Sequence, residues 1–152
     1  TVMNDIFGMG TYSKLFMNVR EKLSLAYYCW SRLIANKGLV LVEGGIDTDK
    51  EKKVSAEVLS QLSDLRNGKT DPEVLESSKR SLKEKYTFTT PEGICSWYAT
   101  QVLDDEIVTP EDTVNGIEAV TMEQVCEAAK KLSIDTIYML KAQEGEESEN
   151  EN

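Results

Sequence analysis

Residues 25–47 read LAYYCWSRLIANKGLVLVEGGID, and this stretch decides the fold class. Its first part, Ala26 to Ala35, is rich in aromatic and branched residues, which favour extended backbone. Asn36-Lys37-Gly38 follows as a short turn in which the glycine can adopt positive φ. Leu39 to Ile46 then has the composition of a returning strand. Residues 25–47 are therefore predicted to form an antiparallel hairpin.

Helical patterns occupy most of the remaining chain. Before the hairpin, Val2 to Phe7 reads as a helix that Gly8 to Tyr12 breaks, and Ser13 offers an N-cap for a second helix. After the hairpin, capping residues and first-turn prolines predict helices that begin near Asp49, Asp71-Pro72, Thr90-Pro91, Thr109-Pro110 and Thr121. Thr136 to Leu140 predicts a final strand.

This order of elements predicts an α+β fold in which helices pack on one face of an antiparallel sheet. Three strands make a thin sheet for so many helices, so we expect missing N-terminal strands or pairing with another chain. The chain begins at Thr1 inside a helical pattern, so we expect a piece of a longer protein. We expect one domain over residues 1–142. Five of the last nine residues are glutamates, which predicts an acidic disordered tail over residues 143–152.

Composition excludes several classes of protein. The net charge is -10 and no basic stripe is present, which argues against nucleic-acid binding. No apolar run approaches the ~20 residues that cross a bilayer, and no secretory signal is visible, so we expect a cytoplasmic protein without membrane contact.

Cys29, Cys95 and Cys126 are odd in number and far apart, as expected for free, buried thiols. Asp47-Thr48-Asp49 lacks the regular oxygen spacing of a calcium loop and reads as solvated helix-end charges.

Three short segments carry a family resemblance. Ser13 to Phe16, Val19 to Lys22 and Leu25 to Tyr28 together resemble the insulinase/pitrilysin (M16) zinc metallopeptidase family, in its second, non-zinc half. The preceding Asn4 to Gly10 is similar to the glycine-ended helix that leads into this motif in the family. The resemblance covers about residues 4–141. It implies half of an M16 peptidase or mitochondrial-processing-peptidase-like domain.

The resemblance also divides the chemistry between two lobes. In such peptidases the zinc half carries His-x-x-Glu-His, whose histidines bind the metal while the Glu polarises a water. This chain contains no histidine, so we expect no catalytic residue, metal ligand or cofactor site on it, and no enzyme activity from it alone. Zinc is implied only in an upstream or partner lobe. The non-zinc half supplies an Arg and a Tyr, seven positions apart, that reach toward the substrate, and these positions fall on Arg20 and Tyr27.

Structural alternatives exist for both residues. Arg20 could pair with a nearby carboxylate at the negative end of its helix, and Tyr27 could be a half-buried strand aromatic. Strand alternation would place Tyr28 on the other sheet face, in the core. Ser24 replaces the glycine often found before Leu-Ala-Tyr in the family, which puts the local turn geometry in question.

Two functional hypotheses follow from different classes. The first is a non-catalytic lobe that binds an extended peptide through Arg20, Tyr27 and the edge of the 25–47 hairpin, next to a zinc-bearing lobe in cis or in trans. Its full-length protein or complex would then be a zinc metalloendopeptidase. The alternative is a catalytically inactive homologue that serves as an assembly or scaffold subunit. A homo-oligomer is compatible with both hypotheses, and the sequence leaves the substrate and the partner open.

Overall fold

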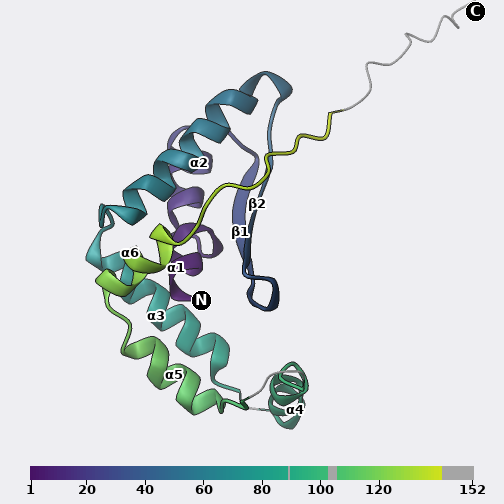
Figure 1. Cartoon of the computed structure of the whole chain (residues 1–152), viewed down its shortest axis with the longest axis vertical. Coiled ribbons are helices and arrows are strands. Elements are labelled where there is room, and N and C mark those ends of the chain that lie inside the picture. Colours follow the sequence, from purple (N-terminus) through teal and green to yellow (C-terminus); the bar gives the residue numbers. More distant parts are fainter. Residues whose placement is uncertain (89, 103–105, 142–152) are drawn as a thin grey trace, which may run out of the picture.

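One β-hairpin lies beside a set of helices in the computed structural model, which describes residues 1–88, 90–102 and 106–141 (Figure 1). Strands β1 (Tyr28–Ile34) and β2 (Leu39–Gly45) pair antiparallel, with Tyr28 opposite Gly45 and Ile34 opposite Leu39. Between them lies a short helical turn, η3 (Ala35–Lys37), and Gly38 closes it with φ of 62°. The predicted α+β class and the predicted hairpin are confirmed.

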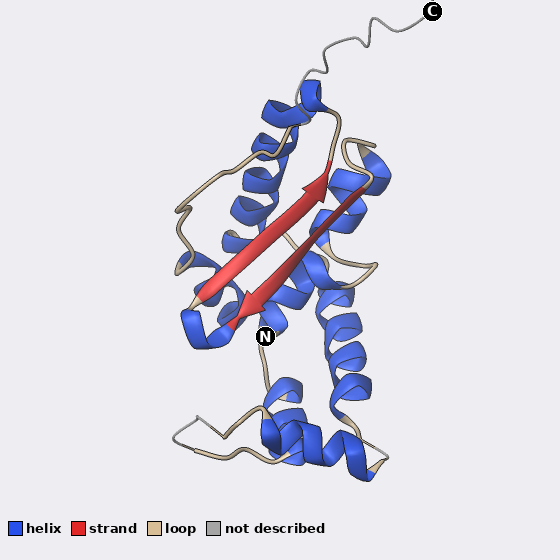
Figure 2. Ribbon diagram, turned by 90° about the vertical axis from the view of Figure 1, so that its right-hand side faces the viewer, coloured by secondary structure: helices blue, strands red, loops and turns tan. Residues whose placement is uncertain are grey.

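The N-terminal helical segments cover one face of the hairpin. They are α1 (Val2–Asn4), η1 (Asp5–Met9) and η2 (Leu15–Lys22), and all three contact β1. Figure 2 shows the two strands crossing in front of the helices, with their other face uncovered. The buried side chains of these segments form the centre of the core: Val2, Ile6, Phe7, Leu15 and Val19. Helices on one face only were predicted, and this arrangement is confirmed.

The position of Tyr28 corrects the sequence analysis. Along β1 the buried side chains are Cys29 and Ser31, so the odd-numbered residues face the helices. Tyr28 alternates with them and lies on the uncovered face, where it is 51% exposed rather than in the core. The alternation of side chains along the strand was predicted correctly, but the helices were expected to cover the face that carries Tyr28.

A second group of helices packs behind the first. Helix α2 (Glu51–Arg66) follows a short turn, η4 (Thr48–Lys50), and contacts η1, η2 and α6 (Met122–Lys130). Arg66 joins the two helices: its Nε donates to the Ala129 carbonyl at 3.2 Å and its Nη2 to the Leu132 carbonyl at 2.6 Å. These carbonyls lie in the last turn of α6 and just beyond it, so the arginine ties the end of α6 to α2.

The remaining helices extend the structure away from the hairpin. Helix α3 (Pro72–Tyr86) packs on α5 (Pro110–Glu118), and α4 (Pro91–Ala99) lies near their far end in Figure 1. Each begins with proline in its first turn. The predicted side-chain caps form at Asp71, Thr90, Thr109 and, as a complete capping box, Thr121.

Three further predictions fail or fall outside the structure. Residues Thr136 to Leu140 form no strand, and among the described residues β1 and β2 pair only with each other. Of the three free cysteines, Cys29 is buried and Cys126 half-buried, but Cys95 is exposed, contrary to the expectation of buried thiols. The predicted acidic tail over residues 143–152 lies outside the described residues. Within the described ranges, no helix is both long and apolar enough to cross a membrane.

The hairpin is docked by a close backbone contact at Gly8. A Cβ at this position would lie 2.5 Å from Ser31 Oγ and 2.7 Å from Ser31 N. Beside it, Asn4 Nδ2 donates to the Ser31 carbonyl at 3.4 Å, and Ser31 Oγ donates to the Asn4 carbonyl at 3.3 Å. Both side chains are fully buried, so these bonds satisfy polar atoms that water cannot reach.

We therefore expect Gly8→Ala to lower the free energy of unfolding by about 3 kcal/mol, because the new methyl group has to displace the β1 backbone. Gly116→Ala in α5 is the matched control, since nothing lies within 4 Å of a Cβ there. It should raise stability by about 0.5–1 kcal/mol through helix propensity. Urea unfolding measures both changes. Equal effects of the two substitutions would contradict the close-contact explanation.

Candidate functional site

A left-handed residue connects η2 to the hairpin. Ser24 has φ of 48°, a conformation that suits glycine better than other residues. Its N–H donates to the Arg20 carbonyl at 3.1 Å, and the Leu25 N–H donates to the Val19 carbonyl at 2.9 Å. These bonds end the helix and turn the chain toward β1. The turn forms although serine, not glycine, occupies the left-handed position.

Arg20 and Tyr27 lie on the wall of one depression beside this turn. Its volume is about 360 Å³, and its walls come from the end of η2, the approach to β1 and the connection between β2 and α2. The lining residues are Arg20, Glu21, Ser24, Leu25, Ala26, Tyr27, Asp47 and Lys50. The structure thus brings the two predicted substrate-binding residues to the same corner of the hairpin.

Tyr27 is an exposed side chain with one specific partner. The residue is 71% exposed, and its hydroxyl donates to Asp47 Oδ1 at 2.7 Å. Its backbone N–H donates to the Gly45 carbonyl at 2.8 Å, which extends the strand pairing by one bond. The hydrogen bond to Asp47 raises the pKa of the phenol. The alternative in which Tyr27 is a half-buried strand aromatic is therefore wrong.

Arg20 lies at the last turn of η2. Its Nε is 3.4 Å from Glu21 Oε1, and its guanidinium carbon is 4.8 Å from the centre of the Phe16 ring. The side chains of Arg20 and Glu21 are 43% and 50% exposed, and ion pairs this open to water add little to stability. Arg20 does pair with a carboxylate, as the structural alternative stated, yet it does so while facing the depression.

Asp47 links Tyr27 to Lys50. Its Oδ2 is 2.7 Å from Lys50 Nζ, while its Oδ1 accepts the hydrogen bond from Tyr27. Hydrogen bonds from Lys50 and then from Tyr27 hold the pKa of Asp47 below its usual value. Asp47 was predicted to be a solvated helix-end charge and was not predicted as a site residue. The signal was available, because the hairpin register carries position 47 back beside position 27.

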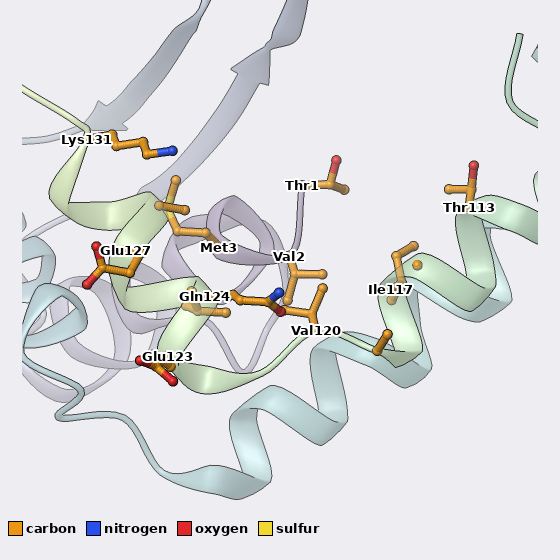
Figure 3. Close-up of a pocket in the computed structure, with 14 residues that line it drawn as sticks. Thr1, Val2, Met3, Thr113, Ile117, Val120, Glu123, Gln124, Glu127 and Lys131 are labelled. Atoms are coloured by element: carbon orange, nitrogen blue, oxygen red, sulfur yellow. The ribbon is translucent and has the colours of Figure 1, made fainter. Parts of the chain in front are cut away.

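A larger depression of about 700 Å³ lies elsewhere, between α1, α5 and α6. Figure 3 shows Val2, Ile117 and Val120 gathered around it, with Glu123, Glu127 and Lys131 along α6. Neither Arg20 nor Tyr27 borders it. It is therefore separate from the candidate site.

The donor set of the chain does not fit a zinc site. The sequence has no histidine, and among the described residues no three His, Cys, Asp or Glu side chains are grouped as metal ligands. Burial raises the pKa of the Cys29 thiol to about 11, so it stays protonated at neutral pH and packs as a small apolar group.

Sequence comparisons relate the chain to a peptidase family. Residues 1–82 match the family described as "Peptidase M16 inactive domain". Over 95% of its length the chain is 34% identical to the "Probable inactive metalloprotease YmfF" of Bacillus subtilis (strain 168). Over 86% it is 25% identical to the "Uncharacterized zinc protease YmxG" of the same organism. The chain spans about a third of each relative, 34% and 33% of their lengths.

Solved structures agree on the fold. A conserved protein from Enterococcus faecalis V583 matches 85% of this chain with a TM-score of 0.77 and 34% identity. A protease from Helicobacter pylori matches 86% with a TM-score of 0.75 and 16% identity, a likeness that concerns the fold alone. The chain covers 31% and 32% of these two structures.

The left-handed turn predicts different effects for two small substitutions at Ser24. Ser24→Gly should raise stability, because glycine adopts positive φ without strain, whereas Ser24→Ala should leave it nearly unchanged, because alanine keeps the Cβ that causes the strain. We expect the two variants to differ by about 1 kcal/mol in the free energy of unfolding. Urea unfolding of the pair provides the measurement. A more stable alanine variant would show that the turn is not left-handed.

Proposed function

Because the chain belongs to the peptidase M16 inactive-domain family, we propose that it is the non-catalytic lobe of an M16-type zinc metallopeptidase. Its work is to bind an extended peptide beside a lobe that carries the zinc, either upstream in the same chain or in a partner. Support comes from the match to an inactive domain and from relatives about three times as long, one of which is named a zinc protease.

One observation carries the proposal: Arg20 and Tyr27 line the same open depression at the corner of the hairpin. Neither residue is buried, and each is paired with a carboxylate that also lines the depression, while Arg20 in addition contacts the Phe16 ring. Two polar groups of different chemistry are thereby available to one ligand.

Arg20 suits a peptide carbonyl or a terminal carboxylate. A guanidinium stays charged at all physiological pH values and presents its N–H donors in a fixed fork. Glu21 contacts Nε, which is one edge of that fork. The weak exposed pair with Glu21 would exchange readily for a ligand oxygen.

Tyr27 suits an oxygen that gains negative charge. A phenol has one O–H donor, and a donor held beside the scissile bond stabilises an oxyanion as it develops. Tyr27 immediately precedes β1, so a peptide that adds to the edge of the hairpin would pass beside it. Backbone pairing of this kind tolerates many sequences.

The name of one relative favours a second candidate function. YmfF is named a probable inactive metalloprotease and is 34% identical to this chain. In that case the chain would be an assembly or scaffold domain of an inactive homologue, and Arg20 and Tyr27 would serve only local packing. The two candidates differ in whether these side chains affect a bound peptide.

The first test substitutes Arg20→Ala and Tyr27→Phe in the full-length protein, together with any partner that carries the zinc. We expect each to reduce peptide turnover about tenfold or more, since each removes a charge-stabilising donor. The matched controls are the same kinds of substitution outside the depression: Arg80→Ala on α3, and Tyr138→Phe at a tyrosine that is 80% exposed. Unchanged turnover in both site variants, with folding intact, would reject the peptide-binding role and leave the scaffold role.

The second test concerns metal. We expect the purified chain to contain no stoichiometric zinc and to hydrolyse no peptide, because its donor set lacks histidine. Elemental analysis after dialysis against zinc provides the measurement. One bound zinc per chain with chelator-sensitive peptidase activity would overturn the proposed division between lobes.

A further inference from the structure

Tyr27 has little packing to hold it in place. Its side chain is 71% exposed, and a tyrosine in water samples several rotamers. A group that must meet a substrate loses affinity when binding has to order it. The position of the phenol therefore depends on specific bonds rather than on the core.

Asp47 supplies the bond that fixes the end of the ring. Oδ1 accepts the Tyr27 hydroxyl at 2.7 Å, while Oδ2 lies 2.7 Å from Lys50 Nζ. The backbone of Asp47 is itself fixed, because the Lys50 N–H donates to the Asp47 carbonyl at 3.0 Å. At the other end of the tyrosine, the Tyr27 N–H is bonded to Gly45. Tyr27 is thus tied through its backbone to the end of β2 and through its hydroxyl to the connection that follows β2.

We propose that Asp47 is a positioning residue that holds the Tyr27 hydroxyl at the wall of the peptide-binding depression. This inference rests on the proposed function, in which Tyr27 contacts the peptide. Lys50 holds the other oxygen of the Asp47 carboxylate at 2.7 Å. With its O–H donated to Asp47, the phenol oxygen still has lone pairs that accept a peptide N–H, so the bond that positions Tyr27 persists when the peptide binds.

Charge makes aspartate suited to this task. A carboxylate accepts a hydrogen bond more strongly than a neutral amide does. The amide of asparagine can nevertheless still accept from the phenol, so Asp47→Asn should retain part of the function. Alanine removes the acceptor altogether. Comparison of these two variants separates the hydrogen bond from the mere presence of a side chain.

The test measures binding of a fluorescein-labelled, unstructured casein peptide to the full-length protein by fluorescence anisotropy. We expect Asp47→Ala to raise the Kd for the peptide about three- to tenfold. Asp47→Asn should raise the Kd by less than half of the factor found for Asp47→Ala. In a Tyr27→Phe background, Asp47→Ala should have no further effect, because its role acts through the hydroxyl. Asp49→Ala, which removes a neighbouring exposed carboxylate, should bind as the unsubstituted protein does.

A second readout does not need a peptide. The hydrogen bond to Asp47 raises the pKa of the Tyr27 phenol, so Asp47→Ala should lower that pKa toward the ordinary tyrosine value. NMR titration of tyrosine-labelled protein follows this shift, with the signal assigned by Tyr27→Phe. Circular dichroism checks that each variant is folded.

The outcomes separate the two claims. If Tyr27→Phe itself leaves peptide binding unchanged, the proposed role of Tyr27 fails, and the inference about Asp47 fails with it. If Tyr27→Phe weakens binding while Asp47→Ala does not, or weakens it equally in both backgrounds, the proposed function stands and the positioning role is overturned. The positioning role would also be overturned if the Asp47→Asn variant bound the peptide no better than the Asp47→Ala variant.

Discussion

The backbone contact between Gly8 and Ser31 is the constraint on which the rest of the structure depends. It brings the first helical segment against β1 more closely than any side chain would allow. The buried bonds between Asn4 and Ser31 fix the same contact from the side. A two-stranded hairpin is marginal by itself in water, so it needs this docking to stay ordered. The docking also decides which sheet face is covered and leaves Tyr28 and Trp30 on the other.

The candidate site is a consequence of that docking at one end of the hairpin. Once β1 is fixed on η1 and η2, the chain has only residues 23–27 in which to turn from helix to strand. The left-handed residue Ser24 makes so tight a reversal possible. Arg20 before the turn and Tyr27 after it are thereby brought to one depression. A change of turn geometry would separate them even if both side chains were kept.

The charges around the depression cancel. Arg20 and Lys50 are balanced by Glu21 and Asp47, each within an ion pair. The chain as a whole carries a net charge of -10, so the site is a locally neutral place on an acidic protein. Recognition at such a site depends on the geometry of individual donors more than on long-range attraction. Recognition by individual donors suits a surface that binds a peptide backbone, because all peptides share the same backbone groups.

The sequence by itself determined the hairpin, the helix starts and the lack of a His-x-x-Glu-His motif in this chain. Each of these rests on local chemistry: branched and aromatic residues in strands, Asp71, Thr90 and Thr121 as caps, and the lack of histidine. Only the tertiary structure decided which face of β1 is buried, because alternation fixes two faces but not which one meets the helices. It also decided that Thr136 to Leu140 forms no strand, since a strand needs a neighbour to pair with. The predicted hairpin already brings position 47 close to position 27, but only the folded structure shows that the two side chains are hydrogen-bonded to each other.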